Sequence, residues 1–234
     1  MRVRFLPKEK IEASARNLLG RYRDRFGLDG DLPVPVEEIL ESFLGLGLEF
    51  GDLRERLGVS DVLGATWVKE RRVIIDQSLD PTEDPRKEGR YRFTIAHELG
   101  HWELHRHPYE AVPGQGVLFH DHPEPSIVCR SKSRKDPMEW QADTFAGYLL
   151  MPKEMVFDTW ESIHGTRDPY DAIEEVADLS VRLGLGEEKR PTVRVARDLA
   201  EIFQVSGQAM QIRLSGLGLI RLENASPGLF DGSV

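Results

Sequence analysis

Apolar residues recur along most of the chain at the spacing of one helical face. Between residues 8 and 26 they form a single stripe, made of Ile11, Ala15, Leu18, Leu19 and Tyr22. This stripe predicts an amphipathic helix. The same pattern, with proline near the start and glycine or proline at the end, predicts further helices. They cover about residues 35–45, 84–107, 136–151, 153–163, 169–183, 192–203 and 206–216.

Short runs of β-branched and small residues interrupt the helical pattern. Gly64–Val68 and Val73–Asp76 flank the charged segment Lys69–Arg72, an arrangement that predicts a β-hairpin. A further short strand is predicted at Ser126–Cys129. The expected fold class is therefore α+β, with a small antiparallel sheet packed against a mainly helical core and with helix-turn-helix-like helices at the C-terminal end.

Composition narrows the class of protein. The hydrophobic fraction of 40% and charged fraction of 30% are those of an ordinary globular protein. We expect no membrane span, because no apolar run reaches about eighteen residues. The N-terminus also lacks the apolar core of a signal peptide. A single cysteine, Cys129, suits a reducing compartment, so we expect a cytoplasmic protein. The net charge of −9 argues against broad binding to nucleic acid.

The strongest chemical signal is the run His97-Glu98-Leu99-Gly100-His101. Two histidines four positions apart on a helix share one face, so His97 and His101 can bind the same metal ion. Glu98 can reach a water on the open side of that ion and act as the general base. Gly100 leaves room for another element to approach the helix closely. The pattern predicts a metal-dependent hydrolase.

The third metal ligand is predicted on the next helix, at Glu139. Two histidines and one glutamate form a known catalytic zinc set that leaves one coordination position open. Asp143 lies one helical turn beyond Glu139 and can accept the free N–H of a ligating imidazole. Zinc is the expected metal, although manganese or iron would suit the same donors.

Five segments resemble the ImmA/IrrE family of metallopeptidases. They are Pro33–Ile39, Arg92–His105, Glu139–Pro152, Leu199–Ser206 and Arg213–Leu219, in that order along most of the chain. The resemblance implies a gluzincin-like core that cleaves a protein substrate, typically a helix-turn-helix transcriptional repressor. It also implies the metal-site roles that the residues themselves suggest. We expect the catalytic domain to cover residues 1–165, with a helical region over 166–234 packed on it.

One position departs from that family's pattern. Asp143 stands where the family commonly has asparagine. A charged group there should raise the basicity of a ligating histidine, so we expect the site to be retained and to bind metal more tightly.

Other residues are candidates for secondary roles. Three of them lie between the two metal-bearing helices and could polarise the scissile carbonyl, namely Tyr109, His120 and His122. The predicted sheet should offer the substrate an edge strand, formed by Gly64, Ala65, Thr66 and Trp67. His105 and His107 are expected to cap the helix or lie on the surface, since the metal already has three ligands.

A non-catalytic regulator is the alternative function. In that case zinc would be structural, and the C-terminal helices over 192–203 and 206–216 would bind DNA or a partner protein. The acidic chain favours a structural role for those helices over DNA recognition. Glu98 favours the peptidase, because a structural site needs ligands but no base. Structural sites also close the fourth position with cysteine or histidine, and Cys129 is the only thiol.

Overall fold

The computed structural model describes residues 5–27, 32–110, 124–130, 136–184 and 190–223. The chain divides into two compact units. The first comprises Met1–Pro152 with Phe203–Val205, and the second comprises Lys153–Ile202 with Ser206–Val234. A division after residue 165 stays a prediction. Among the described residues, no helix is both long and apolar enough to cross a bilayer.

The first unit contains a four-stranded sheet in the order β1-β3-β2-β4. Its strands are β1 (Gly47–Gly51), β2 (Val62–Trp67), β3 (Arg72–Asp76) and β4 (Ile127–Arg130). The predicted hairpin is confirmed by the antiparallel pairing of β2 with β3, and β2 also pairs antiparallel with β4. The α+β class is confirmed as well.

The sheet is mixed, however, and the prediction that it is antiparallel was wrong in one pair. β1 runs parallel to β3, with Leu48 opposite Val73 and Phe50 opposite Ile75. Between these strands the chain passes through the short helix α3 (Leu53–Leu57) and then β2. A crossover of this kind returns the chain in the same direction, whereas a tight hairpin turn reverses it.

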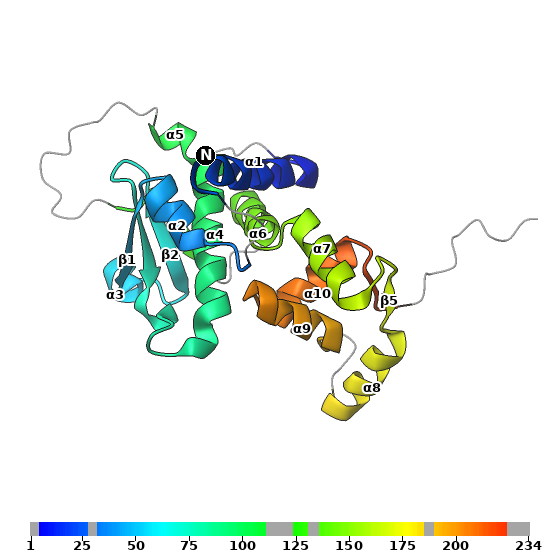
Figure 1. Ribbon diagram of the computed structural model, residues 1–234. Helices are drawn as coiled ribbons and strands as arrows, with labels where there is room; N and C mark the ends of the chain where they lie inside the picture. The colour runs from blue at the N-terminus through cyan, green and yellow to red at the C-terminus, as the bar shows by residue number, and fades with distance from the viewer. Residues whose placement is uncertain (1–4, 28–31, 111–123, 131–135, 185–189, 224–234) are drawn as a thin grey trace, which may run out of the picture. The chain divides into compact units, whose positions relative to one another are not determined.

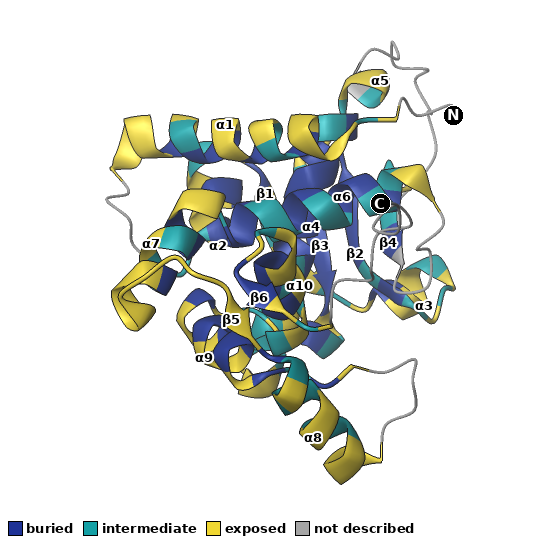
Figure 2. Cartoon of the chain, turned by 90° about the vertical axis from the view of Figure 1, so that its right-hand side faces the viewer, coloured by how far each residue is buried: buried dark blue, intermediate teal, exposed yellow. Residues whose placement is uncertain are grey.

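The helices of the first unit pack around one central helix, α4 (Glu88–His105). α4 contacts β2 and β3 of the sheet and makes its most extensive helix contact with α6 (Pro137–Leu150), as Figure 1 illustrates. Twelve of the residues of α4 are buried, on all sides of the helix. Figure 2 accordingly shows α4 largely in dark blue. The remaining helices are α1 (Lys8–Phe26), which packs on α6, the short turns α2 (Val36–Glu38) and η1 (Ile39–Phe43), and α5 (His107–Glu110).

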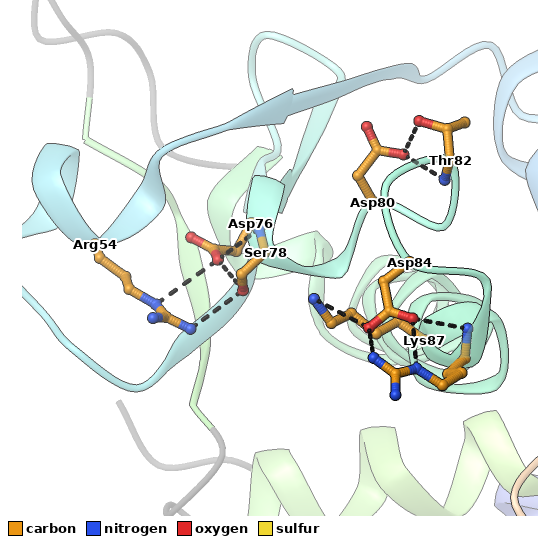
Figure 3. Close-up of polar contacts among 8 residues, drawn as sticks. Arg54, Asp76, Ser78, Asp80, Thr82, Asp84 and Lys87 are labelled. Carbon is orange, nitrogen blue, oxygen red and sulfur yellow. Dashed lines mark hydrogen bonds and ion pairs between the residues drawn. The ribbon is translucent and has the colours of Figure 1, made fainter.

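The start of α4 is set by a series of short aspartate turns. Three aspartates, from the last residue of β3 to the start of α4, each accept a hydrogen bond from the backbone N–H two positions later, which is the geometry of an Asx turn. The pairs are Asp76 with Ser78 and Asp80 with Thr82, both drawn in Figure 3, and Asp84 with Arg86. Arg54 of α3 donates to the Ser78 hydroxyl over 3.1 Å. Two 3-10 turns, η2 (Gln77–Leu79) and η3 (Pro85–Lys87), result, so the helix predicted from residue 84 becomes α-helical at Glu88.

A glycine allows α4 and α6 to approach each other. A Cβ atom on Gly100 would lie 3.1 Å from backbone atoms of Ala142 and 3.2 Å from Cβ of Phe145. Most Cβ contacts are longer than this, so the helix spacing depends on the missing side chain. The predicted close approach at Gly100 is confirmed.

The second unit is helical apart from two very short strands. Its helices are α7 (Lys153–His164), α8 (Ile173–Leu183), α9 (Arg194–Phe203) except for its last residue, and α10 (Gly207–Gly216). The strands β5 (Tyr170–Asp171) and β6 (Ile220–Arg221) pair in parallel, so α8 starts later than the predicted residue 169. The Ser206 side chain caps α10 by accepting from the Ala209 N–H at 3.1 Å.

Candidate metal centre

Three of the predicted site residues meet in the interior of the first unit. His97 Nε2 lies 2.9 Å from His101 Nε2 and 3.3 Å from Glu139 Oε2, and His101 Nε2 lies 3.2 Å from Glu139 Oε1. The exposed fraction of these residues is 7% or less. The three ligand-type atoms therefore face one common point.

Local sequence explains how the two helices bring these groups together. His97 and His101 follow one another by one turn on the buried α4. Asp136 accepts from the Met138 N–H at 2.9 Å and Pro137 occupies the first turn, which fixes the start of α6. Glu139 consequently lies in the first turn of α6, against the part of α4 that carries the two histidines.

Hydrogen bonds outside the cluster orient the His97 ring. Its Nδ1 lies 2.9 Å from Asp143 Oδ1, one helical turn beyond Glu139. A carboxylate accepts, so Nδ1 carries the proton and Nε2 presents its lone pair towards Glu139 and His101. The Asp143 side chain is 44% exposed and joins the cluster to the protein surface.

A second chain of hydrogen bonds orients His101. His105 Nε2 lies 3.3 Å from Gln141 Oε1, and His105 Nδ1 lies 3.1 Å from His101 Nδ1. Because the amide oxygen accepts, His105 Nε2 donates and its Nδ1 is left to accept from His101 Nδ1–H. His101 Nε2 then also presents a lone pair. The expectation of a surface or capping role for His105 was wrong, since its exposed fraction is 5%. The spacing of four from His101 was the available signal.

Electrostatics favour a charged carboxylate at Glu139 and a neutral imidazole at His101, whereas for His97 burial is outweighed by the neighbouring Cys129, Asp143 and Glu139, which raise its pKa well above 6.5 in the metal-free cluster. Burial alone would raise the pKa of Glu139, but hydrogen bonds with His101 and His97 outweigh it and lower that pKa to about 2. Burial lowers the pKa of His101 to about 4. Anionic oxygen and neutral imidazole nitrogen are the forms in which these side chains bind metal.

Glu98 is completely buried beside the cluster. The Thr66 hydroxyl of β2 donates to Glu98 Oε2 at 2.6 Å, whereas Glu98 Oε1 has no hydrogen-bond partner among the described residues. Burial is the main reason that the pKa of Glu98 rises to about 7. A Cβ atom on Gly64 would lie 2.6 Å from Glu98 Oε1, so the carboxylate fits against β2 only because this residue is glycine.

The prediction of a substrate edge at Gly64, Ala65, Thr66 and Trp67 was wrong. These residues belong to β2, which is hydrogen-bonded on one side to β3 and on the other to β4. A strand paired on both sides has no free backbone groups for an added strand. Thr66 instead contributes its side chain to the site, a contact that strand periodicity alone did not indicate.

Cys129 is a further neighbour that sequence reasoning did not bring to the site. It lies on β4 with 6% of its surface exposed, and its Sγ is within 4.8 Å of ligand-type atoms of His97 and Glu98. Burial raises the pKa of the thiol to about 11. Of the loop candidates, Tyr109 is half-buried in α5, and His120 and His122 lie outside the described residues.

Comparisons with known proteins give a family but no curated relative. No curated protein matches the sequence. Among solved structures, a Mycobacterium tuberculosis transcriptional regulator is similar over 90% of this chain, with 15% identity and a TM-score of 0.45. The chain spans about half of that structure, 52% of its length. The model of the IrrE N-terminal-like domain, a peptidase family, matches residues 52–215, which include the whole cluster and Glu98. The chain belongs to this IrrE N-terminal-like peptidase family.

Proposed function

We propose that this protein is a zinc-dependent endopeptidase that cleaves a protein substrate. The observation that carries the proposal is the convergence of His97, His101 and Glu139 on one point, with the buried Glu98 carboxylate beside it. A site that served structure alone would need the three ligands but would gain nothing from an acidic side chain with a raised pKa. The family match supports a peptidase in general terms.

The donor set fits zinc. Two imidazole nitrogens and one carboxylate oxygen, 2.9–3.3 Å apart, suit three corners of a tetrahedron and leave the fourth corner open. A zinc ion held there would lower the pKa of a water in the open position to about 7 and polarise the substrate carbonyl. Manganese or iron would suit the same donors less closely, because both favour more than four ligands.

Glu98 is the proposed general base. Its Oε2 is held by Thr66, which leaves the unpartnered Oε1 to take a proton from the attacking water. A carboxylate with a pKa near 7 can accept that proton at neutral pH and then pass it to the leaving amine. Thr66 keeps the carboxylate from rotating between these two transfers.

Asp143 and the His105–Gln141 pair are proposed to hold the ligands in the required tautomer. Each accepts, directly or through His105, the proton on the Nδ1 side of a ligating ring. The corresponding Nε2 lone pair is then available without rearrangement. Removing such a group typically costs about 10–100-fold in metal affinity or activity, and we expect a loss of this order for Asp143→Ala.

The proposed substrate is a helix-turn-helix transcriptional repressor, as the resemblance in sequence implies. The alternative is a regulator without catalysis, which binds DNA or a partner through α9 and α10. Within the second unit the Gln211 side chain ties the residues before α9 to α10, accepting from the Val193 N–H at 2.7 Å and donating to the Pro191 carbonyl at 3.0 Å. A fixed helix pair of this kind suits either role, so the decision rests on the chemistry of the first unit.

Glu98→Gln separates the two functions. The substitution keeps the size of the side chain but removes the base, so cleavage of a co-expressed helix-turn-helix repressor should fall by about 10²–10⁴-fold. Zinc content, measured by elemental analysis of the purified protein, should stay at about one per chain, whereas His101→Ala should abolish it. Undiminished cleavage by Glu98→Gln would refute the proposed base, and loss of zinc would make Glu98 a ligand.

A further inference from the structure

The exposed face of α10 carries no charge. Its exposed residues lie on one side of the helix and are Gln208, Ile212, Ser215 and Gly216. The Ile212 side chain is prominent there, with an exposed fraction of 68%. The one charged residue of α10, Arg213, is buried, with an exposed fraction of 8%. Because charged residues make up 30% of the chain, an uncharged exposed face indicates a surface of a particular kind.

This face lacks the cations that DNA binding needs. Contacts with phosphate use lysine or arginine, and a helix that reads DNA places its N-terminal residues in the major groove. The start of α10 is instead covered by the segment before α9, since a Cβ atom on Gly207 would lie 2.9 Å from Cγ2 of Thr192. A protein partner suits the face better, because the central parts of protein interfaces are poor in charged residues.

A second copy of this chain is the partner that the charge distribution favours. Each copy has a net charge of −9, so two copies repel one another through most of their surfaces. An uncharged face removes this repulsion at the point of contact. Val181 of α8 is even more exposed, at 83%, but the exposed Asp178 lies one turn before it and the exposed Arg182 follows it. Contact between copies therefore fits α10 better than α8.

The order of residues along α10 is self-complementary about Ile212. An antiparallel pair of these helices, with Ile212 against its own copy, places Gln208 opposite Gly216 and Ala209 opposite Ser215. The members of each pair are equally far from Ile212 along the helix. Three of these four residues are small, which allows two helices to pack closely. A Cβ atom on Gly216 would have no neighbour within 4 Å among the described residues, so the Gln208 side chain of a second copy has room there.

We propose that α10 forms the interface of a twofold-symmetric homodimer, with Ile212 packed against Ile212 of the second copy. The same face serves both copies, so the contact closes on itself and does not propagate into a filament. A single pair of ten-residue helices makes a small interface, which gives a weak dimer with a dissociation constant on the order of 1–100 µM. The proposal concerns the second unit alone and does not depend on the metal site.

Sedimentation velocity of the full chain tests the proposal. The wild type should shift from monomer to dimer as its concentration rises from about 1 to about 300 µM. Ile212→Asp should raise the dissociation constant by more than about 30-fold, because it removes the central apolar contact and places two carboxylates together. Val181→Asp is the matched control, since it makes the same change at an exposed apolar position of another helix in this unit, and it should associate as the wild type does. Circular dichroism of both variants should match the wild type.

Disulfide cross-linking tests the register. Under mild oxidation Ile212→Cys should form a covalent dimer, because the twofold axis brings the two Cα atoms within the range of about 4.4–6.8 Å that a disulfide spans. Gln208→Cys alone should form little, whereas a mixture of Gln208→Cys with Gly216→Cys should form the mixed dimer. The wild type is the control for background oxidation, because its single cysteine, Cys129, is buried.

Each outcome bears on one step of the inference. A wild type that stays monomeric at every concentration would refute the second copy as the occupant and leave this face to a different protein. A dimer that survives Ile212→Asp, or that Val181→Asp weakens equally, would refute α10 as the interface. Cross-linking of Gln208→Cys alone as efficiently as Ile212→Cys would refute the antiparallel register. The proposed peptidase function stands or falls separately, since its residues lie in the first unit.

Discussion

The buried Glu98 carboxylate should make the metal-free protein less stable as pH rises. Its pKa is raised from 4.5 to about 7 in the folded chain, chiefly by burial. The folded state therefore binds the proton more tightly than the unfolded state does. The contribution of the protonated Glu98 side chain to stability is complete below about pH 4.5 and is lost as pH rises through about 7. At about 1.4 kcal/mol per pKa unit, the loss amounts to about 3 kcal/mol.

Glu98→Gln removes this titration and isolates its effect. Glutamine stays neutral at every pH, so the variant should gain about 3 kcal/mol in free energy of unfolding relative to the wild type between about pH 4.5 and about pH 8. Urea denaturation of both metal-free chains across this range measures the difference, because other titrating groups are common to the two proteins. Glu70→Gln, the same change at an exposed position in the loop between β2 and β3, is the control and should not reproduce the gain.

A difference between Glu98→Gln and wild type that is independent of pH would refute this reasoning. It would mean that the carboxylate is solvated in solution, and the case for a base with a raised pKa would fall with it. A wild type that becomes more stable relative to the variant as pH rises would show that charge neighbours dominate over burial.

Three further changes test the surroundings of the site. His105→Ala should weaken zinc binding by about 10–100-fold in competition with a chelator, since the tautomer of the ligand beside it is no longer fixed; unchanged affinity would contradict the hydrogen-bond chain. Thr66→Val removes the hydroxyl that favours the ionised form of Glu98, so the acid limb of the activity profile should move to higher pH by about 1 unit, while Thr66→Ser should restore it. Gly100→Ala should lower the free energy of unfolding by about 1–3 kcal/mol in urea denaturation, because the added methyl would lie 3.1 Å from the Ala142 backbone; a neutral effect would show that α4 and α6 can separate freely.

The sequence identified the residues that follow a local rule. His97 and His101 are four apart on a helix, and Asp136 with Pro137 marks the start of the helix that carries Glu139, so spacing and capping were sufficient. Glu98 was predictable for the same reason.

The contacts that depend on strand order were not predictable in this way. Thr66 and Cys129 reach the site because β2 lies between β3 and β4. That order follows from a parallel crossover and a long-range pairing, which leave no mark on local periodicity. The same limitation produced the wrong edge strand, since a half-apolar run has the same pattern at an edge as in the centre.

The candidate cluster joins parts of the chain that are far apart in sequence. Glu139 follows His97 by 42 positions, and the chain has a single cysteine, so no intrachain disulfide can cross-link the segments that carry these two residues. A metal ion that binds the folded state but not the unfolded state would cross-link these segments instead. It would raise the free energy of unfolding by about 4 kcal/mol at a free concentration a thousand times its dissociation constant. Unlike a disulfide, such a cross-link is reversible and depends on the supply of the metal ion. The lifetime of the protein against unfolding and proteolysis would then follow the free zinc level of its surroundings, which makes abundance a readout of metal availability.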